Sequence, residues 1–262
     1  LGASLAVVDY CRQLGKTVPV YVASSVPEQY RRLPRVEACT EDLHIFDNPD
    51  IDLVVVFDCS DGDYVKRLLD RVVTDPKVIN IDHHMTNSRY GHVNQVLTDA
   101  PATAEVIHRF FLANQIIPSK QAATCLLTGI CFDTTAFSNA STNERALRAA
   151  SDLMMSGARI QDVIRTMFHT RSIAALRVWG TALERLQKHS VLHCITTCLT
   201  RHDLEVDNVT EEEIEGLSNF LNLVIDVEML MVLRECPDGG VKVSLRSSLL
   251  DVSAFAKAFG GG

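Results

Sequence analysis

Short apolar runs alternate with longer stretches of helical periodicity along the first half of the chain. The runs at 18–22, 53–57 and 78–81 are rich in β-branched residues, which predicts strands. The run at 53–57 is continuous, as is typical of a strand buried on both faces. Helical patterns occupy the intervening and following stretches at 2–14, 61–73, 102–114 and 119–132. This alternation predicts a mostly parallel sheet with helices on both faces.

The second half of the chain has a different order of elements. Residues 143–190 are helical in pattern, and an apolar stripe within them consists of Leu176, Trp179, Leu183 and Leu186. We interpret 172–188 as a helix that joins two domains; the alternative is one more core helix of the first domain. Further strands are predicted at 191–199, 227–235 and 241–247, and helices at 211–224 and 252–259.

The predicted fold class is therefore α/β. It comprises a parallel-sheet domain with flanking helices, a helical linker, and a smaller mixed α/β domain. The predicted ranges are 1–171, 172–190 and 191–262.

Composition narrows the class of protein. An apolar fraction of 47% and a charged fraction of 22% exclude a disordered chain, and no apolar run is long enough to span a membrane. The segment 1–6 lacks the basic start of a signal peptide, and eight cysteines in apolar surroundings favour reduced thiols, so we expect a cytoplasmic protein.

The net charge of −8 is unevenly distributed along the chain. Residues 1–189 are nearly neutral at −1, whereas 190–262 carry −7. Thr210 and Glu213 form a capping-box pattern within the acidic stretch, which gives that cluster a structural explanation. The total charge is thus no argument against an anionic substrate.

Acidic and histidine residues follow the predicted apolar segments. Asp58 comes after the run at 53–57, Asp82-His83-His84 begins directly after the run at 78–81, and Asp133 follows the helical pattern. Because ligands gather outside the carboxyl ends of parallel strands, Asp58 and Asp82-His83-His84 are expected to converge there. Such a cluster suits Mn²⁺ or Mg²⁺. Taken singly, each Asp could equally be a turn or cap residue.

The joint pattern resembles the DHH phosphoesterases. The resemblance rests on Asn80-Ile81-Asp82-His83-His84, on Val56-Phe57-Asp58-Cys59-Ser60, and on the segment Gly129-Ile130-Cys131-Phe132-Asp133-Thr134-Thr135-Ala136-Phe137. Downstream, Val243-Ser244-Leu245-Arg246-Ser247 and Phe259-Gly260-Gly261-Gly262 are similar to motifs of the accessory domain called DHHA1. The arrangement is most similar to the oligoribonuclease/pAp-phosphatase subgroup, which acts on very short RNA and on 3′-phosphoadenosine 5′-phosphate (pAp).

The resemblance implies roles for residues of the first domain. Asp58 would bridge two Mn²⁺ ions, with Mg²⁺ as an alternative, and His83 and Asp133 would bind one of them. His84 would contact the scissile phosphate, and Asp82 would orient the histidines. The paired ions would activate water and stabilise charge on the phosphate.

In the second domain, the resemblance implies substrate binding by the residues Ser244, Arg246, Gly260, Gly261 and Gly262. Expected substrates are short RNA, dinucleotides or pAp, and such relatives often form homodimers. The family's first motif, with one His and two Asp ligands, precedes a stretch like Leu1–Ala6. We therefore expect residues 1–262 alone to carry about half of the two-metal site and to hydrolyse weakly.

Five other functions are alternatives to this interpretation. A phosphodiesterase of cyclic or linear dinucleotides uses the same motifs. A RecJ-like exonuclease of single strands would need a basic track, which the acidic stretch 190–262 disfavours. A pyrophosphatase relative has a different second domain, and a non-catalytic nucleotide sensor has no need of metal ligands. A zinc module at Cys194 and Cys198 lacks a second ligand pair at finger spacing.

Overall fold

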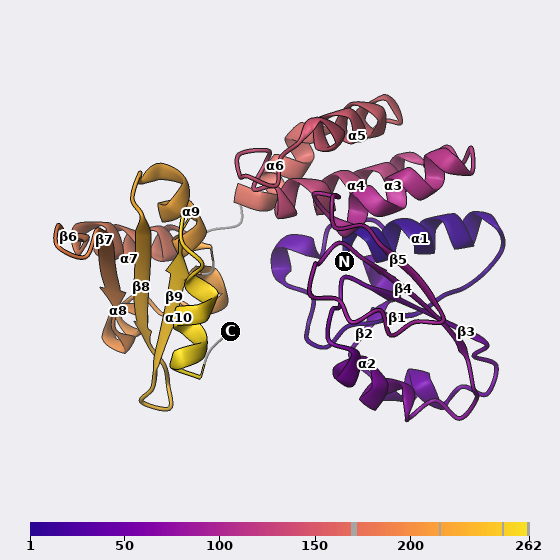
Figure 1. The fold of residues 1–262 in the computed structure, drawn as a ribbon, viewed down its shortest axis with the longest axis horizontal. Coiled ribbons are helices and arrows are strands. Elements are labelled where there is room, and N and C mark those ends of the chain that lie inside the picture. Colours follow the sequence, from indigo (N-terminus) through magenta and orange to yellow (C-terminus); the bar gives the residue numbers. More distant parts are fainter. Residues whose placement is uncertain (169–171, 215, 248, 261–262) are drawn as a thin grey trace. The chain divides into compact units, whose positions relative to one another are not determined.

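The computed structural model describes residues 1–168, 172–214, 216–247 and 249–260 (Figure 1). The chain divides into two compact units, Leu1–Thr170 and Arg171–Gly262. Each unit has its own hydrophobic core, and each is described here by itself.

The first unit is built on three parallel strands. β4 (Lys77–Asp82) lies between β3 (Leu53–Phe57) and β5 (Val93–Val96). Val56 is paired with Asn80, and Asn80 with Asn94, so polar residues face each other across β4 and β5. A second parallel pair consists of β1 (Val20–Tyr21) and β2 (Cys39–Thr40).

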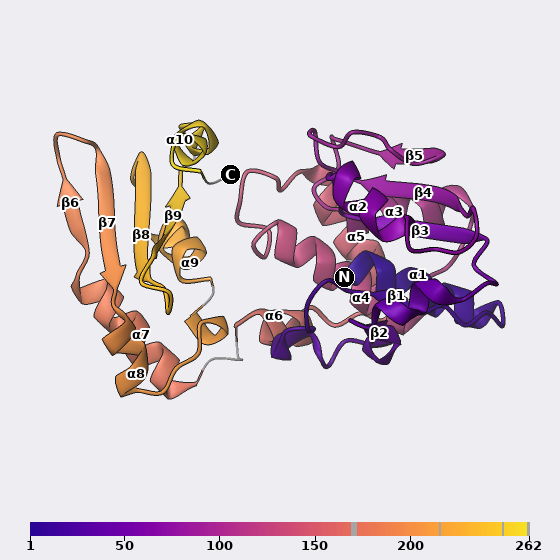
Figure 2. The ribbon, with the colours of Figure 1, turned by 90° about the horizontal axis from the view of Figure 1, so that it is seen from below.

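Helices cover the two sides of this sheet. α2 (Gly62–Leu69) lies on one side, and α1 (Gly2–Gln13), α3 (Thr103–Ala113) and α4 (Lys120–Asp133) lie on the other (Figures 1 and 2). α5 (Glu144–Met155) and α6 (Ile160–Phe168) complete the unit. Short 3₁₀ turns occur at Glu28–Tyr30, Val36–Ala38 and Leu43–Asp47.

The core of the first unit is mainly helical. α4 is its central element, because Leu126, Leu127 and Ile130 are fully buried and α4 packs against α1, α3, α5 and α6. Side-chain oxygens of Ser119 and Asp61 accept backbone N–H bonds at the first turns of α4 and α2, which fixes where these helices begin. The carboxyl end of α4 is thereby brought to the sheet edge where β3 and β4 end.

The second unit is a four-stranded mixed sheet with helices. The strands follow the order β6 (Gln187–His189), β7 (Cys194–Leu199), β8 (Met229–Glu235) and β9 (Val241–Arg246). β7 and β8 are parallel, and the outer pairs are antiparallel. The helices are α7 (Ile173–Glu184), α8 (Arg201–Val206), α9 (Leu217–Val224) and α10 (Val252–Ala258), with a 3₁₀ turn at Glu212–Ile214.

The α/β fold class is confirmed, and three details differ from expectation. The strand at 53–57 is not buried on both faces: Leu53 is 48% exposed, and among the described strands β3 pairs only with β4, at the sheet edge. The helix expected as a linker at 172–190 ends at Glu184, and its buried residues Ala175, Val178, Trp179 and Ala182 belong to the core of the second unit. The helix expected at 211–224 is divided into a 3₁₀ turn and α9.

Two further observations concern the whole of the described chain. None of its helices combines the length and apolar character needed to cross a bilayer. All eight cysteines are free thiols.

Candidate metal centre

Asp58 lies directly after β3 in an unusual backbone conformation. Its φ of 59° is in the left-handed region, which Asp tolerates better than most side chains. The backbone N–H of Asp58 donates to the carbonyl of Ile81, and the Thr103 hydroxyl donates to Asp58 Oδ1 at 2.6 Å. Asp58 is therefore held by two elements, its backbone by the sheet and its carboxylate by the first residue of α3.

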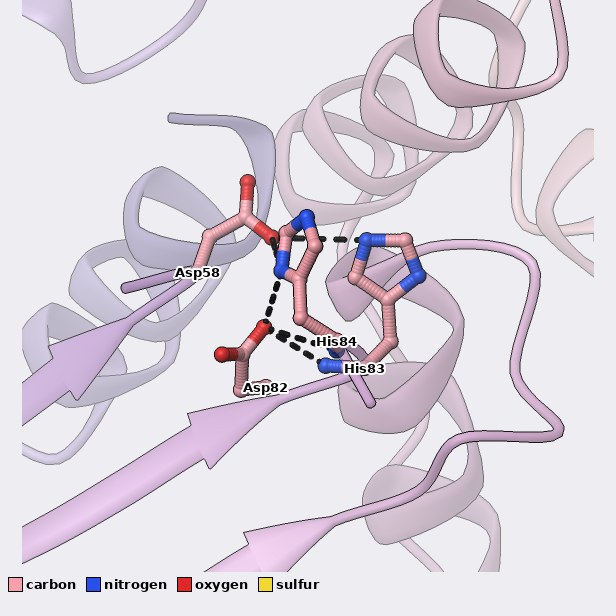
Figure 3. Close-up of side chains that lie close together, drawn as sticks. All are labelled: Asp58, Asp82, His83 and His84. Atoms are coloured by element: carbon pink, nitrogen blue, oxygen red, sulfur yellow. Dashed lines mark hydrogen bonds and ion pairs between the residues drawn. The ribbon is translucent and has the colours of Figure 1, made fainter. Parts of the chain in front are cut away.

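Asp82 ends β4 and is fully buried. Its Oδ1 accepts bonds from the backbone N–H groups of His83 and His84 and from His84 Nδ1 at 2.7 Å (Figure 3). Its Oδ2 accepts from Asn87 Nδ2 at 2.6 Å. Burial alone would raise the pKa of Asp82, but these hydrogen bonds lower it below its ordinary value. Asp82 thus stays ionised while buried.

The two histidines are held through their Nδ1 atoms. His83 Nδ1 lies 3.3 Å from the carbonyl oxygen of Ala100, and His84 Nδ1 is bound to Asp82. His83 Nε2 then lies 3.6 Å from Asp58 Oδ1 and 4.0 Å from Asp133 Oδ2. The ring of His84 packs edge-on against His83, with centroids 4.4 Å apart. Only the His83 Nε2 atom is presented to both carboxylates.

The ring of His84 is strongly affected by its neighbours. Burial would lower its pKa, but the hydrogen bond to Asp82 and the negative charges of Asp82, Asp58 and Asp133 raise the pKa above its ordinary value. His84 is therefore suited to holding a proton beside a negatively charged ligand.

Asp133 is the last residue of α4. Its carbonyl accepts from Asn139 Nδ2 at 2.7 Å, within a turn in which Thr135, Ala136 and Phe137 all have positive φ. Burial and the charge of Asp58 raise the pKa of Asp133 to about 6. This turn brings the carboxylate to the same point as the strand-end residues.

The donor atoms fit a divalent cation. Asp58, Asp82, His83 and His84 each offer one ligand atom within 4.8 Å of the others, and Asp133 reaches His83 Nε2 from α4. Asp82 is occupied by its hydrogen bonds, which leaves Asp58, His83 and Asp133 as the better ligands. Carboxylates with one imidazole, whose Nδ1 is fixed by a carbonyl, are a donor set typical of Mn²⁺ or Mg²⁺ sites.

Sequence reasoning missed the asparagines around this cluster. Asn80, Asn87 and Asn94 form a hydrogen-bonded set beneath Asp82, with Asn80 completely buried. Asparagine occurs so often in turns that nothing in the sequence marks out Asn87 or Asn94, and Asn80 is quoted only as part of the motif that contains Asp82. A fully buried Asn in the middle of a strand becomes recognisable only once the strand has been placed.

The residues expected to bind substrate lie in the second unit. Arg246 ends β9; its Nε donates to Asn219 Oδ1 at 2.7 Å and its Nη1 to the carbonyl of Leu245 at 2.8 Å. Ser244 lies two residues earlier on the same face of β9. Gly260 follows α10 with a φ of 78°, and open space lies where a side chain would be. Gly261 and Gly262 lie outside the described residues.

The carboxylates and histidines gathered at the strand ends define the class of this protein: an α/β protein with a candidate metal site at the edge of its parallel sheet. Residues 1–130 match the model of the DHH family, N-terminal domain. Residues 1–130 therefore form a DHH-family domain, and the chain is a metal-dependent hydrolase that acts on phosphate esters.

Curated relatives support the same assignment. The bifunctional oligoribonuclease and PAP phosphatase NrnA of Thermus thermophilus is 29% identical over 94% of this chain. A probable protein of that name from Streptococcus mutans is 29% identical over 71% of the chain. This chain spans 72% and 59% of their respective lengths. The resemblance to the oligoribonuclease/pAp-phosphatase subgroup is thereby confirmed.

A solved structure supports the fold. The crystal structure of an exopolyphosphatase-related protein from Bacteroides fragilis aligns with a TM-score of 0.86 and 22% identity, over 94% of this chain and 74% of that one.

Proposed function

We propose that this protein hydrolyses phosphoester bonds in short oligoribonucleotides, in pAp, or in both, with water activated by two divalent ions. The observation that supports this most directly is the convergence of Asp58, His83, His84 and Asp133 at one sheet edge. The names of the curated relatives support the substrate class.

In this proposal Asp58, His83 and Asp133 hold the metal, which we expect to be Mn²⁺. When bound, divalent ions lower the pKa of water and stabilise charge on a phosphate. Asp58 would act as a ligand through a carboxylate that the Thr103 hydroxyl holds in place at Oδ1. The raised pKa of Asp133 predicts that metal binding releases a proton when the pH is below about 6.

His84 acts on the substrate phosphate, and Asp82 orients its ring. Asp82 keeps the imidazole oriented through the 2.7 Å bond to Nδ1, so that Nε2 is available to the ligand. The raised pKa of His84 favours the charged ring, which donates to a phosphate oxygen and gains strength as negative charge develops there.

The second unit holds the remainder of the substrate. The Arg246 guanidinium matches two oxygens of a phosphate, with Ser244 beside it on β9. Gly260, Gly261 and Gly262 would allow backbone N–H groups to approach the ligand closely. We further propose a cytoplasmic protein, consistent with eight free thiols, that can form a homodimer.

A substrate panel tests the proposal. The full-length protein with Mn²⁺ is incubated with pAp, the dinucleotide pApA, cyclic-di-AMP, a five-nucleotide RNA and long single-stranded DNA. We expect the fastest turnover with pAp, pApA or the short RNA. A preference for cyclic-di-AMP would reassign the substrate, and a preference for long DNA would contradict the subgroup.

A further inference from the structure

A row of three asparagines, of which Asn80 is fully buried and Asn87 and Asn94 are half-buried, lies beside the metal centre. Asn80 on β4 and Asn94 on β5 are direct cross-strand partners, and Asn87 comes from the loop between these strands. Asn80 Nδ2 donates to Asn87 Oδ1 at 2.8 Å and to Asn94 Oδ1 at 3.0 Å. The loop is folded tightly onto β4, since a Cβ on Gly91 would come within 2.9 Å of Asn80 Cβ.

Backbone groups fix which way the Asn94 and Asn80 amides point. The N–H of Gly91 donates to Asn94 Oδ1 at 3.0 Å, and the carbonyl of Gly91 accepts from Asn94 Nδ2 at 2.6 Å. A backbone N–H can only donate and a carbonyl can only accept. The Asn94 oxygen must therefore face Asn80, which in turn must present its Nδ2.

The same reasoning applies to Asn87. Its Oδ1 accepts from the backbone N–H of Arg89 at 2.7 Å, and its Nδ2 donates to the carbonyl of Cys59 at 3.1 Å. With Asn80 Nδ2 also directed at Oδ1, the Asn87 amide has one allowed orientation. Its Nδ2 is consequently the group that faces Asp82 Oδ2, at 2.6 Å.

The fixed donor and acceptor roles extend from Asn87 to Asp82 and His84 in the metal centre. Because Asn87 donates to Oδ2, the Asp82 carboxylate is held as an acceptor, with Oδ1 directed at His84 Nδ1. An acceptor at 2.7 Å from Nδ1 places the proton of the neutral ring on Nδ1. The Nε2 atom is then left with its lone pair.

We propose that Asn87 is a positioning residue that fixes the tautomer and orientation of His84 through Asp82, with Asn80 and Asn94 setting the direction of its amide. Asn87 is not among the residues proposed to hold metal or substrate, and it contacts Asp82, Cys59 and Arg89 instead. Its effect on turnover rests on the proposed function, but its effect on the His84 ring does not.

The test measures the tautomer in the metal-free full chain. Nitrogen-15 NMR of the imidazole at alkaline pH, where the ring is neutral, distinguishes a proton on Nδ1 from one on Nε2. In the wild type we expect His84 to carry it on Nδ1. Asn87→Asp has nearly the same shape but places a carboxylate against Asp82 Oδ2, so Asp82 turns or protonates and the tautomers mix. Asn87→Ser, which adds no charge, should give a partial shift.

A double variant that exchanges the hydrogen-bond donor and acceptor, together with a control variant, makes the test specific. The double variant Asn87→Asp with Asp82→Asn exchanges donor and acceptor, and should return the proton to Nδ1 because the Oδ1 at position 82 still accepts from the ring. Asn114→Asp, at the exposed end of α3, should leave the His84 signals unchanged. In turnover, we expect Asn87→Asp to lower kcat by about 10- to 100-fold.

A His84 ring that keeps its Nδ1 proton in both single variants overturns the inference, as does an equal shift in Asn114→Asp. A tautomer change in a protein whose wild type turns over no nucleotide would instead support the inference and refute the proposed function.

Discussion

At the residue scale, two carboxylates approach a single imidazole nitrogen. Asp58 and Asp133 lie 3.6 and 4.0 Å from His83 Nε2. Their mutual repulsion and the burial of Asp133 raise the pKa of Asp133 to about 6. In the metal-free protein this arrangement costs stability, and a bound cation would offset that cost.

The first prediction concerns Asp133→Asn. Because the folded chain holds the Asp133 proton more tightly than the unfolded chain, metal-free stability falls as pH rises from about 3.8 to about 6, and the loss persists above that. The side chain is 38% exposed, so solvent screens the repulsion. Above pH 6 we expect the variant to be about 1 kcal/mol more stable than the wild type.

Urea unfolding of both proteins at pH 5 and pH 8, with and without Mn²⁺, measures this difference. Added Mn²⁺ should stabilise the wild type more than the variant. An equal gain from Mn²⁺ in both proteins would contradict the role of Asp133 as a ligand.

The second prediction concerns Asp58→Asn. Asparagine tolerates the left-handed backbone at this position and can still accept from Thr103, so the fold should be kept. Hydrolysis by the full-length protein should fall by at least about 100-fold, because a neutral amide binds cations poorly. The pKa of Asp133 should also fall, since the Asp58 charge contributes to raising it.

Asp63→Asn, in the first turn of α2, is the matched control and should retain wild-type activity. Full activity of Asp58→Asn in the cell would favour a nucleotide sensor over an enzyme.

At the element scale, glycines determine how closely the helices of the first unit approach. A Cβ on Gly2 would lie 2.4 Å from the carbonyl oxygen of Cys125, and one on Gly129 would lie 2.7 Å from Ala104 Cβ. α4 is therefore clamped between α1 and α3, and the position of Asp133 at its end depends on this fit.

The third prediction compares two helical glycines. Gly129→Ala should destabilise the protein by about 1–2 kcal/mol, because overlap with α3 outweighs the better helix propensity of alanine. Gly180→Ala in α7 meets no atom within 4 Å and should stabilise by up to about 1 kcal/mol. Thermal unfolding measures both changes, and a stabilised Gly129→Ala would show that α4 can shift.

The elements that could be predicted from the sequence are those with strong local patterns. The β-branched run at 53–57 forms β3 with the expected bounds, and the capping box of Thr210 and Glu213 is present. β5 was missed because Val93–Val96 contains two polar residues whose partners, including Asn80, lie on another strand. The edge position of β3 was missed for a similar reason, since burial depends on strand pairing rather than on local composition.

The candidate site also has features that could be predicted from the sequence and features that could not. Asp58, His83, His84 and Asp133 could be named because Asp58 and the two histidines follow strand patterns, and because all four lie in segments that resemble DHH motifs. The resemblance implied separate tasks for the two histidines, with Asp82 orienting both. The contact of His83 Nδ1 with the Ala100 carbonyl could not be predicted, because it depends on the tertiary structure; only His84 Nδ1 is bound to Asp82.

At the scale of the whole molecule, charge is unevenly distributed along the chain, although the two units, Leu1–Thr170 and Arg171–Gly262, each carry a net charge of −4. The stretch 190–262 carries −7, whereas 1–189 is nearly neutral before any metal binds. Arg246 is one of five basic residues in that acidic stretch, and its guanidinium already holds Asn219 in place of an acid. Its charge is consequently little neutralised and available to a phosphate.

The last prediction separates substrate binding from chemistry. Arg246→Ala in the full-length protein should raise KM for its preferred nucleotide by about 10- to 100-fold, the value of a lost charged hydrogen bond. Hydrolysis of bis(4-nitrophenyl) phosphate, a small diester without a nucleoside, should be unchanged, since Asp58, His83 and Asp133 remain intact. Lys242→Ala, at an exposed position on the same face of β9, is the control and should alter neither substrate. Equal losses with both substrates would indicate that Arg246 supports the fold or the metal centre, and would contradict its assignment to substrate binding.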